Sequence, residues 1–215
     1  MKVEIWSDVA CPFCYIGKKR FEQALSTFEH KDQIQVEWKS FQLDPTLPKK
    51  GSVKIQEYMA QQKGLSVAEV KSMFQNVVQM AQGEGIAMNM DGIIMANTLS
   101  MHRLIQLAKT HGLGAEAEEE FFKAYFFGKD FTNEDILLEI SKAIGLDEVE
   151  AREVIQSEKF TEEVEKDIYE AKTIGVRGVP HFVFHDKYVI SGAQHSETFK
   201  GALEKAYKEW EENPK

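Results

Sequence analysis

The two cysteines of this 215-residue chain, Cys11 and Cys14, stand between a strand pattern and a helix pattern. Before them, residues 2–5 alternate charged and apolar side chains, which predicts a half-buried strand. After them, helical periodicity continues to about Thr27. Pro12 fits the first turn of that helix, because the first N–H groups of a helix have no partner within it. Any fold of this chain must therefore place the cysteine pair where a strand passes into a helix.

The rest of the chain changes pattern twice. A second strand is predicted at about 33–41, and the two prolines of segment 43–48 mark the strongest boundary. Helical patterns then fill 53–173, and strand patterns return as a hairpin over 182–190 before a last helix. This order predicts an α/β fold with an inserted all-helical domain. The predicted segments are 1–52 for the first part of the α/β domain, 53–173 for the inserted helical domain and 174–215 for the second part of the α/β domain.

Local signals mark several helix ends in the middle segment. Ser66 and Glu69 have the spacing of a capping box. Gly145 is placed to end one helix, and Asp147 is placed to begin the next. The acidic run over 116–120 predicts a solvated first turn, where carboxylates interact favourably with the helix dipole.

Charge and composition narrow the class of partner. The chain has 26 Lys and Arg against 35 Asp and Glu, and the resulting formal charge of -9 disfavours nucleic acid. Two cysteines are too few for a disulfide-stapled secreted scaffold. Glu4 lies where a secretory signal would be apolar, and no run reaches the roughly 18 apolar residues of a membrane helix. We therefore expect a cytoplasmic protein without membrane partners. In a reducing compartment, a cysteine pair is more often catalytic or metal-binding than structural.

The spacing of the pair suits redox chemistry. The first cysteine, at a helix N-terminus, faces unpaired N–H groups that stabilise its thiolate, and the second lies one turn further on. Cys11 is therefore the predicted nucleophile and Cys14 the resolving thiol. Half of a zinc site has the same spacing but needs two further ligands. None of the six histidines forms a ligand pair at the usual spacing beside another ligand type, so we expect no metal.

The segment Cys11-Pro12-Phe13-Cys14-Tyr15, with the strand that precedes it, resembles the active-site segment of the DsbA-like branch of the thioredoxin superfamily. Within that branch it is most similar to the FrnE-like oxidoreductases. The segment 175–180 resembles the part of the superfamily that carries a cis-proline, and 191–194 resembles the stretch after the last strand. The resemblance spans most of the chain and implies a thioredoxin-like fold for the α/β domain.

The resemblance also implies roles for single residues. Pro180 takes the cis-proline role, and the backbone of Val179 before it offers hydrogen bonds to an extended substrate peptide. Arg177, close to that proline, is a candidate for binding an anionic group of the substrate. Pro12 and Phe13 are expected to tune the redox couple. Because Phe13 replaces the histidine of periplasmic DsbA and supplies no cation, we predict a less oxidising couple.

The predicted function is thiol–disulfide oxidoreductase or isomerase, acting on a protein or small molecule that contains a thiol or disulfide. No tightly bound cofactor is expected, and glutathione is a candidate redox partner. The first alternative is a glutathione-dependent isomerase or transferase, of the 2-hydroxychromene-2-carboxylate isomerase or kappa glutathione transferase type. Those relatives typically have serine at the position of Cys11. The second alternative is a peptide-binding chaperone module. A homodimer through the helical block or the sheet edge stays open.

Three features of the helical segment have two interpretations each. A dense aromatic cluster over 121–131 is either a lid over Cys11 or the core of the helical domain, and the core is favoured. The methionines between 73 and 101 are either an adaptable substrate surface or core, and core is again favoured. His102 and Arg103 either bind an anionic group or belong to a solvated helix face, and the solvated face is favoured.

Overall fold

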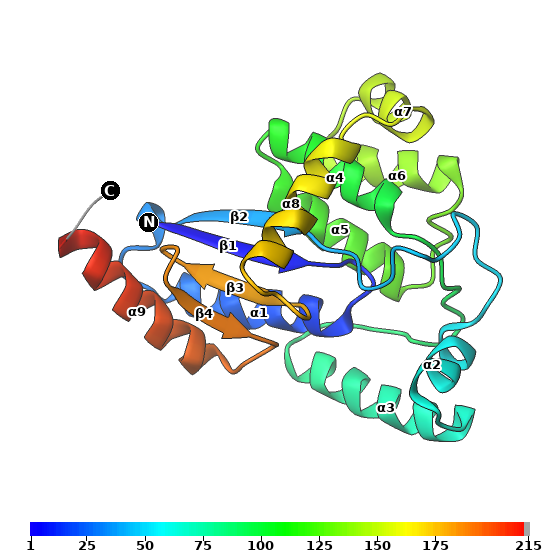
Figure 1. Cartoon of the computed structure of the whole chain (residues 1–215), viewed down its shortest axis with the longest axis horizontal. Helices are drawn as coiled ribbons and strands as arrows, with labels where there is room; N and C mark the ends of the chain where they lie inside the picture. Colours follow the sequence, from blue (N-terminus) through cyan, green and yellow to red (C-terminus); the bar gives the residue numbers. More distant parts are fainter. Residues whose placement is uncertain (213–215) are drawn as a thin grey trace. The chain divides into compact units, whose positions relative to one another are not determined.

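The computed structural model describes residues 1–212, and Figure 1 shows the order of their helices and strands. The strands are β1 (Lys2–Ser7), β2 (Gln35–Ser40), β3 (His181–Phe184) and β4 (Tyr188–Ser191). The helices are α1 (Pro12–Ser26), α2 (Ile55–Lys63), α3 (Val67–Gly83), α4 (Leu99–Thr110), α5 (Gly114–Phe126), α6 (Glu134–Ile144), α7 (Glu148–Gln156), α8 (Thr161–Thr173) and α9 (Ser196–Glu212). A short 3-10 helix, η1 (Lys31–Gln33), precedes β2.

The four strands form one mixed sheet in the order β2-β1-β3-β4. β1 runs parallel to β2, with Val3 opposite Val36, and antiparallel to β3, with Ile5 opposite Phe182. β3 and β4 form the predicted hairpin. The sheet joins strands from both ends of the chain, with helices on its faces, and this is the arrangement of a thioredoxin-like fold. The predicted α/β class and the thioredoxin-like fold are confirmed.

The turn between β3 and β4 contains no glycine, although its backbone is left-handed. His185 and Asp186 have φ angles of 53° and 55°. Both central residues of a type I′ turn need positive φ, and Asp and His adopt it more readily than most residues with a side chain.

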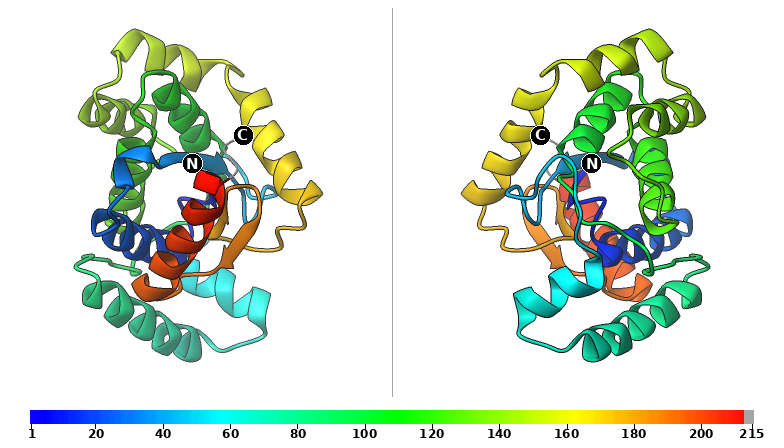
Figure 2. Two further views of the ribbon diagram at one scale, coloured as in Figure 1. Left: turned by 90° about the vertical axis from the view of Figure 1, so that its left-hand side faces the viewer. Right: turned by 90° about the vertical axis from the view of Figure 1, so that its right-hand side faces the viewer.

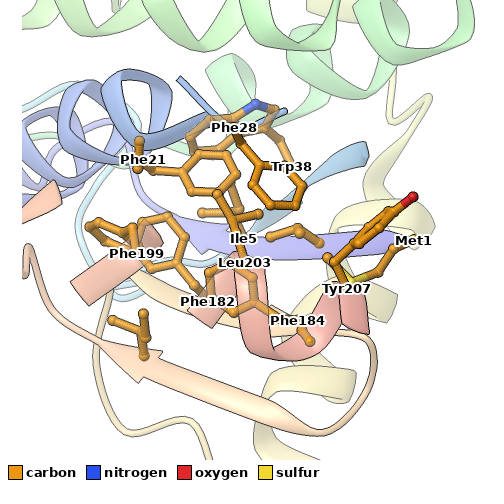
Figure 3. Close-up of a cluster of buried hydrophobic side chains, with 14 residues drawn as sticks. Met1, Ile5, Phe21, Phe28, Trp38, Phe182, Phe184, Phe199, Leu203 and Tyr207 are labelled. Carbon is orange, nitrogen blue, oxygen red and sulfur yellow. The ribbon is translucent and has the colours of Figure 1, made fainter. Parts of the chain in front are cut away.

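One face of the sheet carries the main hydrophobic core of the α/β part (Figure 3). Strand residues at alternate positions, Ile5 and Phe182 among them, point into it, as period-2 alternation requires. They pack against Phe21 of α1 and against Phe199 and Leu203 of α9. The rings of Phe21 and Phe182 have centroids 5.6 Å apart. This core seats α1 on the sheet and so fixes the helix that begins at the cysteines.

The opposite face of the sheet is covered in part by α8, and Figure 2 shows α1 and α8 on opposite sides of the sheet. Trp6 and Val183 from the sheet form a smaller cluster there with Ala171 of α8 and with Val176. The indole Nε1 of Trp6 donates a hydrogen bond to the carbonyl oxygen of Asp167 (2.9 Å). The central strand β1 is therefore buried on both faces.

Contacts divide the chain into two compact units. One consists of residues 1–43 with 166 to the end of the described chain, and the other of residues 44–165. The sequence analysis placed the boundaries after residues 52 and 173. The structure groups 44–52 with the helices and 166–173 with the sheet, because the second half of α8 packs on β1.

The helical unit contains α2 to α7 and the first turn of α8. Its predicted caps are present: Ser66 and Glu69 form a capping box, and Asp147 accepts hydrogen bonds from the first N–H groups of α7. Gly145 ends α6 with a φ of 98°, which a side chain would disfavour. The favoured interpretation of the aromatic cluster is confirmed for its buried members, which are Phe121, Phe122, Tyr125, Phe126 and Phe131. Phe127 is instead 58% exposed.

The favoured interpretation of His102 and Arg103 as a solvated helix face is wrong. Both residues are buried in α4, at 0% and 4% exposure. The Arg103 guanidinium donates from Nε to the carbonyl oxygen of Lys159 (2.9 Å) and from Nη2 to those of Val154 and Ser157. Arg103 therefore binds backbone carbonyl groups at the end of α7 and in the loop that leads to α8. This is a structural role within the helical unit.

Two further expectations are corrected in part. Glu118 in the acidic run is only 1% exposed, because it lies one helical turn before Phe122 on the buried face of α5. Among the methionines, Met73 and Met80 of α3 are 38% and 39% exposed. The other four of that group are buried as core residues, as favoured, and they are Met88, Met90, Met95 and Met101.

Candidate active site

Cys11 occupies the N-cap of α1, directly after the loop that leaves β1. Its backbone is extended, with φ -94° and ψ 111°, and Pro12 follows in the first helical turn as predicted. The Cys11 carbonyl oxygen accepts hydrogen bonds from the N–H groups of Cys14 (3.0 Å) and Tyr15 (3.4 Å). The thiol of Cys11 thus lies at the positive end of the helix dipole, where a thiolate is stabilised.

A buried carboxylate fixes the loop that carries Cys11. Asp8 is 1% exposed. Its backbone oxygen accepts the N–H of Cys11 (2.9 Å), and its Oδ1 accepts the N–H of Ala10 (3.2 Å). Its Oδ2 accepts the N–H of Leu43 (2.7 Å), in the segment that follows β2. The sequence analysis assigned no role to Asp8, although an Asp just before a helix start is a signal for such hydrogen bonds.

The two thiols have different environments. Neither is in a disulfide, and Cys14 is fully buried while Cys11 is 5% exposed. Burial raises the pKa of the Cys14 thiol well above its ordinary value, and the hydrogen bond and charge of Cys11 raise it further. Hydrogen bonds from the Asp8 backbone and the Ser7 hydroxyl act in the opposite direction. Cys14 is therefore a protonated thiol at neutral pH.

The segment before β3 reaches Cys11 from the other end of the chain. The Val179–Pro180 peptide bond is cis, as the resemblance implied. The Sγ of Cys11 donates a hydrogen bond to the carbonyl oxygen of Val179, at a distance of 3.5 Å. Val179 is half-buried and Pro180 is buried. Two predicted site segments that lie 168 residues apart in sequence are therefore in direct contact.

Pro12 is half-buried, and two further predicted site residues, Phe13 and Arg177, are exposed. Phe13, between the cysteines, is 41% exposed, and the motif contains no cationic side chain. Arg177 is exposed and lies two residues before Val179. Their roles in tuning and binding remain predictions.

Sequence reasoning missed the contacts that hold the cis-proline segment against α1. The N–H of Gly192 donates to the carbonyl oxygen of Pro180 (2.8 Å), and Arg20 Nη1 donates to the carbonyl oxygen of Ala193 (2.6 Å). Gly17 of α1 has no room for a side chain, because a Cβ there would lie 2.9 Å from Cγ of Pro180. A glycine inside a helix was an available signal for this close approach, whereas nothing local predicts the partner of Arg20.

Within residues 1–212, no group of three or more His, Cys, Asp or Glu side chains is arranged to hold a metal ion. In the same part of the chain, no helix is long and apolar enough to cross a membrane.

Comparison with known proteins places the chain in a family. The model of the DSBA-like thioredoxin domain matches residues 2–204, so the chain belongs to the family of DSBA-like thioredoxin domains. A solved structure with 36% sequence identity is the “probable DsbA oxidoreductase” from Streptomyces coelicolor. It superposes with a TM-score of 0.93 over 97% of this chain and 91% of that chain.

Two more distant structures share the fold. The 2-hydroxychromene-2-carboxylate isomerase has 15% identity and a TM-score of 0.71, with both chains fully covered. The cytosolic disulfide reductase DsbM from Pseudomonas aeruginosa has 16% identity and a TM-score of 0.70, over 97% of this chain and 99% of that one. DsbM has also been solved with glutathione. The predicted DsbA-like membership is confirmed, while the finer FrnE-like placement remains a prediction.

Proposed function

We propose that this protein is a thiol–disulfide oxidoreductase or isomerase in which Cys11 is the nucleophile and Cys14 the resolving thiol. The observation that carries the proposal is the arrangement of the two free thiols. Cys11 lies at the N-cap of α1 with its Sγ 3.5 Å from the Val179 carbonyl oxygen, and Cys14 lies buried in the first turn. Membership of the DSBA-like family supports this chemistry.

The reaction is two successive thiol–disulfide exchanges. The Cys11 thiolate attacks one sulfur of a substrate disulfide, forms a mixed disulfide and releases the first substrate sulfur as a thiolate. Cys14 then loses its proton and attacks Sγ of Cys11, which releases the second substrate sulfur as a thiolate. The substrate gains two electrons and becomes a dithiol, while the protein is oxidised to the Cys11–Cys14 disulfide. A substrate dithiol is oxidised by the same steps in reverse.

The structure supports different roles for the two thiols in the reaction. Cys11 is the N-cap of α1 and its Sγ lies beside the Val179 carbonyl oxygen, so this thiol is the one placed to attack. Burial keeps Cys14 protonated, so it does not compete for substrate before the mixed disulfide forms. An extended peptide can pair with the backbone at Val179, beside the sulfur that it must reach.

A glutathione-dependent isomerase or transferase is the second candidate function. The 2-hydroxychromene-2-carboxylate isomerase and the glutathione-bound DsbM share the fold, which favours glutathione as a ligand or redox partner. Cys11 stands where the 2-hydroxychromene-2-carboxylate isomerases and kappa glutathione transferases typically have serine, and it would hold the glutathione thiolate. The chaperone module is the third candidate, and it needs neither cysteine. The cytoplasmic location remains a prediction of the sequence.

Reduction of insulin with dithiothreitol as the electron donor tests the proposal. We expect Cys11→Ser to reduce insulin no faster than dithiothreitol alone. Cys14→Ser should form the mixed disulfide but fail to resolve it, so mass spectrometry should detect a covalent adduct on Cys11. Substrate refolding that survives Cys11→Ser would support the chaperone function instead. Retention on immobilised glutathione without insulin reduction would support the transferase function.

A further inference from the structure

A buried arginine on the active-site helix holds the loop after β4. Arg20 lies in α1, and its side chain is mostly buried, with the residue only 9% exposed. Its Nη1 donates a hydrogen bond of 2.6 Å to the carbonyl oxygen of Ala193, which is 173 residues away in sequence. A charged donor that is removed from water interacts more strongly with a carbonyl than an exposed one, and its loss leaves that carbonyl without this donor.

This contact closes a ring of interactions that includes the nucleophile. Ala193 follows Gly192, whose N–H donates to the carbonyl oxygen of Pro180 (2.8 Å). Pro180 follows Val179, whose carbonyl oxygen accepts the hydrogen bond from Sγ of Cys11 (3.5 Å). Helix α1 completes the ring, because Cys11 is its N-cap and Arg20 lies further along the same helix.

Gly17 sets the distance across this ring. It lies three residues before Arg20 on the same helix, and residues at that spacing share a face. A Cβ at position 17 would lie 2.9 Å from Cγ of Pro180 and 3.6 Å from Cα of Ala193. The bare backbone of α1 therefore touches the cis-proline turn, and the Arg20 guanidinium holds the following loop against the helix from the adjacent turn.

We propose that Arg20 is a positioning residue. It holds the backbone of Val179 at its distance from Cys11 and thereby sets the affinity for extended peptide disulfides. The inference rests on the proposed function and names its substrate class. A peptide substrate uses the Val179 backbone, whereas a small aromatic disulfide needs only the sulfur of Cys11. Loss of Arg20 therefore weakens the binding of a peptide substrate more than it slows the reaction with a small aromatic disulfide.

The test compares a peptide disulfide with 5,5′-dithiobis(2-nitrobenzoic acid). We expect Arg20→Met to raise KM for the peptide about tenfold with little change in kcat, which corresponds to about 1.4 kcal/mol of binding. The rate with the small disulfide should change by less than about twofold. Arg20→Lys keeps one cationic donor and should recover much of the peptide KM. Arg152→Met is the matched control and should behave as wild type, because the Arg152 side chain is exposed on α7.

A second pair of variants probes the same ring without removing Arg20. Gly17→Ala presses a methyl group against Pro180 and should also raise KM for the peptide. Gly201→Ala is its control, because a Cβ at that position of α9 meets nothing within 4 Å. Equal losses with both substrates that track a lower melting temperature would show that Arg20 only supports the fold. An unchanged peptide KM would equally overturn the inference.

Hydrogen exchange of the Gly192 amide separates this inference from the proposed function. That N–H donates a hydrogen bond to the Pro180 carbonyl oxygen, so its protection from exchange reports on the ring of interactions without any turnover. We expect Arg20→Met to accelerate its exchange about tenfold or more while the amides of β1 keep their protection. Unchanged Gly192 protection would overturn the inference even in an active enzyme. A wild-type protein that reduces neither substrate would overturn the proposed function, and the exchange result would still decide whether Arg20 holds the loop.

Discussion

The two cysteines lie three positions apart, and their environments differ because Cys11 caps helix α1 whereas Cys14 lies inside it. Cys11, at the N-cap, faces the unpaired N–H groups of α1. Cys14, one turn later, is fully buried, and burial disfavours its thiolate. The place of each cysteine relative to the helix start was predictable from the sequence, because it follows from Pro12 and the strand before it. The Ser7 hydroxyl at Cys14 was not predictable, because Ser7 belongs to the strand and nothing in its pattern points to the helix.

Burial of Cys14 predicts a pH-dependent second step. Resolution requires the Cys14 thiolate, and below a raised pKa the thiolate fraction grows about tenfold per pH unit. Release of the second thiolate from a 2-nitro-5-thiobenzoate adduct on Cys11 should therefore accelerate steadily between about pH 6 and pH 9. Ser7→Ala removes a hydrogen bond that lowers this pKa, and it should slow release about fivefold, the equivalent of about 1 kcal/mol. A release rate that is flat over this range in stopped-flow absorbance would contradict the assignment of Cys14.

At the scale of elements, α8 is fixed to the sheet by charges as well as by apolar contact. Lys39 of β2 is 7% exposed, and its Nζ lies 2.8 Å from Glu170, 3.5 Å from Glu4 and 3.6 Å from Asp167. Burial alone would lower the pKa of Lys39. The hydrogen bond to Glu170 and the charges of Asp167 and other carboxylates outweigh burial and hold the pKa above its usual range. The Lys39 ammonium thus joins β1, β2 and α8 near the end of β2.

Replacing Lys39 tests that role. Lys39→Met leaves the buried carboxylates of Glu4 and Asp167 without this cation, and we expect the free energy of unfolding to fall by about 3–5 kcal/mol. Lys187→Met is the control, because Lys187 is exposed and its ion pair with Glu209 is screened by solvent. Urea denaturation monitored by tryptophan fluorescence measures both variants. Equal, small effects of the two substitutions would show that the Lys39 cluster contributes no more than a surface pair.

The elements themselves were largely predictable, whereas their long-range polar contacts were not. Alternation predicted β1 and β2, and cap residues such as Ser66 and Asp147 marked helix starts, because these signals act within a few residues. Glu118 and Arg103 were expected in solvent because charge usually means exposure, yet each is buried. Arg103 is buried because three backbone carbonyls from the end of α7 and the following loop satisfy its guanidinium. Such partners depend on tertiary packing and leave no local trace.

At the scale of the whole molecule, the sheet takes strands from both ends of the chain, and this interrupted topology was visible in the order of patterns. The boundaries were harder to place because α8 is one continuous helix whose pattern does not change where it reaches the sheet. The same topology brings Val179 to Cys11, so the candidate site is complete only when both ends of the chain have folded together. The motif alone led to the proposed chemistry, while the hydrogen bonds from Arg20 and Gly192 emerged only from the structure.

The central claim is that Cys11 and Cys14 interconvert between a dithiol and a disulfide. Equilibration against dithiothreitol redox buffers, followed by alkylation and mass counting of free thiols, tests it most directly. We expect a single two-electron transition in which both thiols disappear together, at a potential clearly more reducing than the roughly -120 mV of DsbA, because Phe13 supplies no cation to the Cys11 thiolate. Two thiols that remain free under every buffer would contradict the account. A potential near that of DsbA would refute the role given to Phe13.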